Sequence, residues 1–377
     1  MTKKLRRGYT TGTCAQAATK AAITMLLGNV DVDQVTVSLP GKDVLTLKIS
    51  DVRKEYKNNQ NKDIESVCCA VQKDSGDDPD ITNGIFVYSK VTKVASGIVL
   101  DGGLGVGRVT KPGLDQPVGN AAINRVPRKM ILGEVEKACE QYGYDGGIQV
   151  EISIPKGVEL AKKTFNPRLG IEGGISVLGT SGIVEPMSEQ ALLDTIELEM
   201  KVKRAEEREY LIMAPGNYGL DFLREAYGIL DKDVVKCSNY IGQSMDMASE
   251  CGFKGLVLAG HIGKLIKVSG GIMNTHSRWA DCRMDLLATA MLRAGLSGDR
   301  ARTVLECVTT DDALALLTEE ERIITIEQIM KSIEKYMEYR IADQMPIGAI
   351  LYSNVYGILG KTSKVDELMK LWEEEKS

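Results

Sequence analysis

The sequence contains two histidines, His261 and His276, and histidine is the side chain best suited to move a proton near neutral pH. His261 lies in Gly-His-Ile-Gly-Lys, directly after a short apolar run, whereas His276 lies in Asn-Thr-His-Ser. Either ring could act as an acid, a base or a ligand, or could be purely structural. No Ser-His-Asp or H-E-x-x-H pattern accompanies them. We therefore take His261 as the candidate catalytic base on its location alone.

The glycines around His261 belong to a repeated pattern of strand, loop and helix. Apolar runs at 210–214, 234–237 and 256–259 each precede a helix-forming segment, and 349–352 can add a fourth strand. Such repeats predict a parallel, Rossmann-like sheet, in which ligands bind beyond the carboxyl ends of the strands. The candidate cofactor-binding residues at these ends are Gly216, Asn217, Gly219, Gly260 and Gly263.

A second candidate site is the stretch GYTTGTCAQAATKAA at residues 8–22. Its alanines favour a helix, and the spacing of Thr13 and Gln16 predicts a capping box that starts this helix at Thr13. Thr10, Thr11 and Thr13 would then cluster at a helix N-terminus, which attracts anions. A plain, well-capped helix without a ligand is the alternative.

An acidic run, KDSGDDPDIT, occupies residues 73–82. Its spacing lacks the downstream glutamate of an EF-hand. Asp77 and Asp78 could still bind a hard cation or accept hydrogen bonds from a ligand. A solvated turn explains the run equally well.

Two glycine-rich stretches remain. VLDGGLGVG at 99–107 is similar to a nucleotide-binding loop, but the residues after it read as strand and turn, whereas a dinucleotide loop must open a helix. We therefore predict a hairpin there. Residues 165–187 alternate apolar side chains with glycine, serine and threonine, which is poor helix material and predicts packing along a site.

The predicted order of strands and helices in the N-terminal half differs from that in the C-terminal half. Runs of strands with few helices indicate an α+β fold with a largely antiparallel sheet. We expect an α+β domain at 1–190 and an α/β domain at 191–377. The expected N-terminal strands are 35–39, 44–49, 85–94, 97–100 and 148–154, with helices near 65–72 and 128–142.

The composition excludes several classes of protein. Of the 377 residues, 43% are hydrophobic and 26% charged, which is typical of a soluble globular protein. The net charge of −5 indicates no general affinity for nucleic acid or anionic membranes. No membrane span or secretory signal is apparent. The eight cysteines form no C-x-x-C pair, so we expect no zinc site and a reducing, cytoplasmic location.

Four long stretches, taken together and in this order, resemble one family. They are GYTTGTCAQAATKAA, KDSGDDPDIT, FNPRLGIEGGISVLGTSGIVEPMS and GHIGKLIKVSGGIMNTHS. They are similar to motifs of the cobalt-precorrin-5B C(1)-methyltransferase family of anaerobic cobalamin biosynthesis. The resemblance extends over about residues 6–360.

The resemblance implies transfer of a methyl group from S-adenosylmethionine to carbon 1 of a cobalt-bound corrin precursor. The products would be cobalt-precorrin-6A and S-adenosylhomocysteine. It also implies an N-terminal α+β domain with a permuted ribosomal-S5-domain-2-like fold and a C-terminal α/β domain with a four-stranded parallel sheet. Cobalt arrives within the substrate, so no metal site of the protein is expected.

A flat corrinoid with several carboxylates requires basic side chains and hydroxyls. Our hypothesis is that the N-terminal domain binds the corrinoid and the C-terminal sheet binds S-adenosylmethionine. Self-association into a homo-oligomer and transient contact with other pathway enzymes stay open. The candidate substrate-binding residues are Thr10, Thr11, Thr13, Asp77, Asp78, Arg125 and Arg168.

Two other functions stay open at this point. One is a nucleotide-dependent phosphotransferase, because S5-like domains occur in some small-molecule kinases and 99–107 could hold phosphate. The other is a corrinoid carrier that binds the same ligand without turnover.

Overall fold

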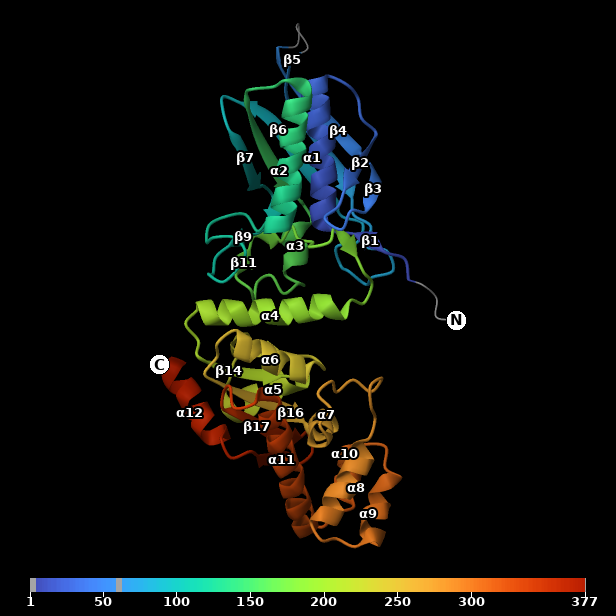
Figure 1. Cartoon of the computed structure of the whole chain (residues 1–377), viewed down its shortest axis with the longest axis vertical. Coiled ribbons are helices and arrows are strands. Elements are labelled where there is room, and N and C mark those ends of the chain that lie inside the picture. The colour runs from blue at the N-terminus through green and yellow to red at the C-terminus, as the bar shows by residue number, and fades with distance from the viewer. Residues whose placement is uncertain (1–4, 59–62, 377) are drawn as a thin grey trace. The chain divides into compact units, whose positions relative to one another are not determined.

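Two units make up the chain in its computed structural model, which describes residues 5–58 and 63–376. Unit 1 spans Met1–Glu189 and unit 2 spans Gln190–Ser377. Each unit is built around a hydrophobic core of its own. Figure 1 shows the elements of both units along the chain.

Unit 1 contains a five-stranded sheet that is antiparallel except at one pair, which confirms the prediction of a largely antiparallel sheet. The parallel pair is β10 with β7. The segment 65–72 is a strand, so the helix expected there is wrong. It pairs with a neighbour on each side, and its alternate residues Val67, Cys69 and Val71 are buried. The sheet order is β4 (Ser50–Asn58), β5 (Asp63–Gln72), β6 (Phe86–Val94), β10 (Gly147–Ser153) and β7 (Ile98–Gly102).

Two helices pack against this sheet, and Figure 1 shows them side by side. They are α1 (Thr11–Gly28) and α2 (Arg125–Tyr142). Ala15, Ala18 and Ala22 of α1 are completely buried. Because alanine is small, α1 can approach both α2 and the sheet closely, and the alanine-rich sequence therefore has a packing role in addition to its helix propensity.

The helix cap differs from the sequence-based expectation. Thr10, not Thr13, is the N-cap, and its Oγ1 accepts a hydrogen bond from the N–H of Thr13 at 3.2 Å. The Gln16 amide, expected to complete a capping box, instead donates to Glu134 Oε1 at 2.7 Å. Glu134 lies on α2 and is buried, so pairing between the two helices replaces the local capping bond.

Short strands connect the motifs of unit 1. The hairpin predicted at 99–107 is wrong, because β7 pairs with β10 and β8 pairs with β12. Gly105 has φ +77°, and a Cβ on it would collide with Ile154 O, so only glycine fits this crossing of backbones. The short elements are β1 (Gly8–Tyr9) with β13 (Ile183–Val184), β2 (Gln34–Ser38) with β3 (Val44–Lys48), β8 (Gly105–Val106) with β12 (Gly174–Ile175), β9 (Arg108–Val109) with β11 (Ile171–Glu172), and α3 (Gly157–Ala161).

Unit 2 contains four parallel strands, which confirms the predicted Rossmann-like sheet. A fifth strand, β18, is antiparallel at one edge and was not expected. The chain passes from β14 to β15 on one side and then returns to β16 on the other. The order is β15 (Val234–Lys236), β14 (Tyr210–Ala214), β16 (Gly255–His261), β17 (Ile347–Ser353) and β18 (Gly357–Lys361).

Helices cover both faces of this sheet. Leu211 and Met213 of β14 belong to the core of one face, whereas Ile212 and Ala214 belong to the other. The second face is covered by α5 (Asn217–Tyr227) and α12 (Val365–Lys376). The first face carries α4 (Glu189–Ala205), α6 (Ile241–Glu250), α7 (Ile262–Leu265), α8 (Arg283–Arg293), α9 (Gly298–Leu305), α10 (Thr310–Ala315) and α11 (Glu319–Ile341).

The cap assignment can be tested by substitution at Thr10. Thr10→Ala removes the side-chain acceptor for the Thr13 N–H and should lower the free energy of opening of α1 by about 1 kcal/mol. Amide hydrogen exchange of residues 8–28 measures this loss. Thr10→Ser keeps the acceptor and is the matched control. Equal protection in the alanine variant and the wild type would contradict the assignment.

Candidate functional site

A cavity of about 440 Å³ opens beside the carboxyl ends of the parallel strands in unit 2. Small-molecule sites fall in the range of roughly 300–1,000 Å³. The loops after β14, β16 and β17 line it, together with the start of α10. The strand order reverses between β14 and β16, and ligands of open α/β sheets bind at such a switch point.

Three of the five predicted cofactor-binding residues line this cavity, namely Gly216, Gly219 and Gly263. A Cβ on Gly216 would meet no other atom within 4 Å, so this position opens into free space. Gly260 does not line the cavity, because a Cβ there would lie 3.2 Å from Leu265 in the core. Asn217 is exposed outside it, with its Oδ1 3.5 Å from Lys236 Nζ.

The start of α5 lies close against the sheet. A Cβ on Gly219 would be 2.6 Å from the Cβ of Ala214, so a larger residue would push the first helical turn away from β14. Tyr218, in the same turn, lines the cavity and is 73% exposed. Gly219 therefore determines how close the N-terminus of α5 lies to the cavity. Tyr218 places an aromatic ring at the rim of the cavity.

His261 ends β16 and caps α7. Its Nδ1 accepts a hydrogen bond from the Gly263 N–H at 3.0 Å, so the proton of the neutral ring is on Nε2. Burial lowers the pKa of His261, although the nearby Asp311 carboxylate raises it. The neutral ring thus carries a donor at Nε2, an atom that is buried in the cavity wall. Acting as the predicted base would require the Gly263 bond to break.

Asp311 lines the same cavity and was not found from the sequence. Its Oδ1 accepts a hydrogen bond from the Ser353 hydroxyl at 2.7 Å, and its Oδ2 lies 3.6 Å from His261 Nε2. The chain separates Asp311 from both partners by more than 40 residues. The one available signal was the predicted fourth strand, whose end carries Ser353.

The lining also includes two cations that sequence reasoning missed, Lys264 and Arg283. Burial lowers the pKa of Lys264, whose Nζ donates to Asn239 Oδ1 at 3.0 Å. Arg283 donates from Nε to Asp281 at 2.7 Å. The cavity wall therefore carries both signs of charge, which suits a ligand with both cationic and anionic groups.

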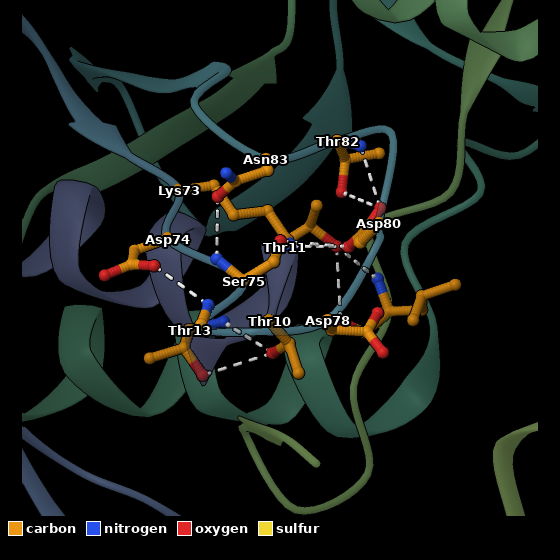
Figure 2. A network of polar contacts seen from close by, with 12 residues as sticks. Thr10, Thr11, Thr13, Lys73, Asp74, Ser75, Asp78, Asp80, Thr82 and Asn83 are labelled. Carbon is orange, nitrogen blue, oxygen red and sulfur yellow. Dashed lines mark hydrogen bonds and ion pairs between the residues drawn. The ribbon is translucent and has the colours of Figure 1, made fainter. Parts of the chain in front are cut away.

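In unit 1, three of the quoted motifs meet around the N-terminus of α1 (Figure 2). The Thr11 hydroxyl bonds to both backbone groups of Leu178, and the Met187 N–H donates to Asp78 at 2.9 Å. A Cβ on Gly8 would collide with Ser75, so the first motif and the acidic run touch through their backbones.

The predicted substrate-binding threonines have partners within the protein. Thr10, Thr11 and Thr13 are buried. The Gly12 N–H donates to Leu178 O, and the Thr13 hydroxyl donates to Gly182 O at 2.7 Å. The Thr10 hydroxyl caps the helix, and contacts with residues 178 and 182 use the hydroxyls of Thr11 and Thr13.

The remaining predicted residues of unit 1 are more open. Asp77 is exposed, and its Oδ2 accepts the Arg6 N–H at 2.8 Å. Arg125 begins α2 with its side chain 85% exposed. Arg168 is half-buried in the segment between α3 and β11. None of these three belongs to the threonine cluster drawn in Figure 2.

A buried ion pair ties the acidic run together. Lys73 is 3% exposed and donates to Asp80 at 2.6 Å, while Asp80 also accepts from Thr82 (Figure 2). Burial raises the pKa of Asp80, but the hydrogen bonds from Lys73 and Thr82 and the charge of Lys73 together outweigh this, and the net pKa lies below the ordinary value. The buried polar groups of Lys73 and Asp80 are thus paired within the acidic run itself. Within residues 5–58 and 63–376, no cluster of three or more His, Cys, Asp or Glu side chains could hold a metal.

Unit 2 thus has a Rossmann-like parallel sheet with helices on both faces and a cavity at its switch point. The CbiD family profile matches residues 1–186, and the profile of the CbiD C-terminal domain matches residues 274–363. The chain belongs to the CbiD family. In the part that the structure describes, none of the helices is both long and apolar enough to span a membrane.

Named relatives agree with this membership. A cobalt-precorrin-5B C(1)-methyltransferase of Ruminiclostridium cellulolyticum is 45% identical, with 98% of this chain and 96% of the relative covered. Its counterpart in Alkaliphilus metalliredigens is 43% identical, with 99% and 96% covered. A crystal structure of the cobalamin biosynthesis protein cbiD from Archaeoglobus fulgidus is 29% identical over 73% of this chain and 83% of that one, with a TM-score of 0.39.

The Lys73–Asp80 pair makes the stability of unit 1 depend on pH. A carboxylate with a lowered folded pKa stabilises the fold above its unfolded pKa of about 3.9, and this contribution is lost as the pH falls through the folded value. Asp80→Asn should cost roughly 3 kcal/mol at pH 7, because it leaves the Lys73 ammonium buried and unpaired. The loss should shrink below pH 4.

Urea unfolding at pH 7 and pH 3 measures both effects. Circular dichroism follows both units, whereas the fluorescence of Trp279 and Trp372 follows unit 2, so the difference reports unit 1. Asp77→Asn, which changes an exposed carboxylate of the same run, is the control. A loss for Asp80→Asn that is identical at both pH values would contradict the ion-pair account.

The electrostatic contact between His261 and Asp311 predicts that the pKa of His261 depends on the Asp311 charge. Asp311→Asn removes the charge that raises the pKa of His261, so this pKa should fall below its wild-type value. Nuclear magnetic resonance of the imidazole Cε1 proton measures the change, with His276 as the reference signal. A rise or no change in the His261 pKa would show that Asp311 does not act on this ring.

Proposed function

We propose that this protein transfers a methyl group from S-adenosylmethionine to carbon 1 of cobalt-precorrin-5B, giving cobalt-precorrin-6A and S-adenosylhomocysteine in anaerobic cobalamin biosynthesis. Membership of the CbiD family supports the proposal, together with relatives of that name that match nearly the whole chain. The single structural observation that carries it is the cavity at the switch point of unit 2.

The donor fits this cavity in its chemistry. S-adenosylmethionine carries an amino-acid carboxylate, an ammonium and a sulfonium, and the wall supplies Lys264 and Arg283 as well as Asp311. Tyr218 at the rim is available to stack on the adenine. Gly216 leaves space for the ligand to approach the start of α5.

The reaction needs little acid–base machinery. The methyl group leaves a sulfonium and joins a ring carbon of an electron-rich macrocycle, so rate depends mainly on alignment and on exclusion of water. His261, as a neutral donor beside Asp311, binds and orients the ligand rather than removing a proton. This replaces the base role expected from its position in the sequence.

Unit 1 binds the corrinoid in this proposal. The exposed Arg125 and the half-buried Arg168 are the candidates to bind the substrate carboxylates. Asp77 and Asp78 order the loop at residues 73–82 by accepting backbone N–H groups. The buried threonines shape the backbone of this region and do not meet the substrate directly. Cobalt enters as part of the substrate.

One experiment tests the function and the donor site together. The purified protein is incubated with the cobalt-precorrin substrate and S-adenosylmethionine, and the product should gain the mass of one methyl group. Gly216→Val places a side chain in the cavity and should weaken S-adenosylhomocysteine binding by calorimetry at least tenfold.

The control is Gly298→Val, which lies in the same unit at an exposed position outside the cavity. Corrinoid binding without any methyl gain would favour a carrier. An unchanged affinity in Gly216→Val would show that the methyl donor binds elsewhere. It would not contradict the proposed methyltransferase activity.

A further inference from the structure

The cavity contains a hydrogen-bond donor and an acceptor that face each other without bonding. His261 Nε2 is buried and has no hydrogen-bond partner within the described chain. The nearest carboxylate oxygen, Asp311 Oδ2, is 3.6 Å away, which is too long for a hydrogen bond. Both residues line the cavity, so the gap between them lies in the cavity wall. A buried donor left in this state costs free energy until something satisfies it.

The surrounding bonds determine which atom donates and which accepts. The Gly263 N–H donates to His261 Nδ1, so the ring carries its proton on Nε2. Ser353 Oγ accepts the N–H groups of Val355 and Tyr356, at 3.0 and 3.2 Å, and its own proton goes to Asp311 Oδ1. Asp311 Oδ1 is therefore occupied by Ser353, and Oδ2 is the oxygen that lies nearest the ring. Nε2–H donates and Oδ2 accepts.

A hydroxyl is the group that matches this pair. It accepts a hydrogen bond with one lone pair and donates its proton to a second partner. An ammonium can only donate and a carboxylate can only accept, so each would satisfy one half of the pair. The ribose of the methyl donor carries two neighbouring hydroxyls, and each of them has this matching chemistry.

The end of the neighbouring strand β15 supports the same conclusion. Dinucleotide-binding Rossmann folds place an acidic residue beyond the second strand, where it bonds a ribose hydroxyl. Here that strand is followed by Cys237, Ser238 and Asn239, so no carboxylate stands there. Asp311, at the start of α10, is the carboxylate that lines the cavity.

We propose that His261 and Asp311 together bind a ribose hydroxyl of the methyl donor, the ring donating from Nε2 and the carboxylate accepting at Oδ2. Ser353 is the positioning residue that holds the carboxylate in place. This inference rests on the proposed function, because it takes the cavity as the donor site. It makes the pair a determinant of specificity for ribonucleosides.

Calorimetry with three ligands tests the pair. S-adenosylhomocysteine is compared with its 2′-deoxy and 3′-deoxy analogues on the wild type and on Asp311→Asn. The wild type should bind one of the two analogues roughly 10- to 100-fold more weakly, the range of a hydrogen bond to a charged group. In Asp311→Asn this ratio should fall to within about threefold, because the Ser353 hydroxyl keeps the amide oxygen at the Oδ1 position and an NH2 group replaces the acceptor at Oδ2.

The matched control is Asp312→Asn, which changes the next residue of the same helix, outside the cavity, and should keep the wild-type ratio. Equal affinity of the wild type for all three ligands would overturn the inference, and so would a ratio that survives in Asp311→Asn. The wild-type comparison stands even if a variant fails to fold.

Failure of the proposed donor site gives a different result. In that case Gly216→Val binds S-adenosylhomocysteine as tightly as the wild type. If Gly216→Val weakens binding while both deoxy analogues bind normally, the donor site stands and the role of the pair is wrong.

Discussion

The site in unit 2 depends on the pairing of β14 with β16. These strands are neighbours, although β15 lies between them in the chain. The chain runs from β14 to β15 at one edge of the sheet and then returns past β14 to β16. The loops after β14 and β16 therefore lead to opposite faces of the sheet. The space between those loops is the cavity. Gly216, Gly219 and His261 line the cavity because of that reversal.

Several glycines of this protein occupy positions where the backbone lies too close to its neighbours for a Cβ atom. Gly219 brings the start of α5 against Ala214, whereas Gly216 leaves the cavity open beside it. In unit 1, Gly8 and Gly105 occupy places where a Cβ would strike neighbouring backbone. The many glycines of this sequence therefore serve two different ends. Some permit close packing, and Gly216 leaves the cavity open.

Unit 1 uses its polar side chains in a way that its composition does not suggest. Threonines and aspartates in a glycine-rich segment look available for a ligand, yet Thr10, Thr11 and Thr13 are buried and bonded to the chain itself. Lys73 is also buried and neutralised by Asp80. Buried polar groups must be paired, so these motifs stabilise a loop arrangement. A substrate would then meet the side chains outside this network.

The sequence by itself determined the elements whose signals are local. The strand–loop–helix repeats predicted the parallel sheet, the alanine-rich run predicted α1, and the long motifs indicated the family. Local signals were not enough where a tertiary partner competes. Thr10 rather than Thr13 caps α1 because Gln16 pairs with Glu134 of α2, and 65–72 is a strand because two neighbours hydrogen-bond to it. Only the tertiary structure brought Asp311 to His261, 50 residues earlier in the chain. The packing of α10 against α7 and α8, and not any pattern along the chain, sets that distance.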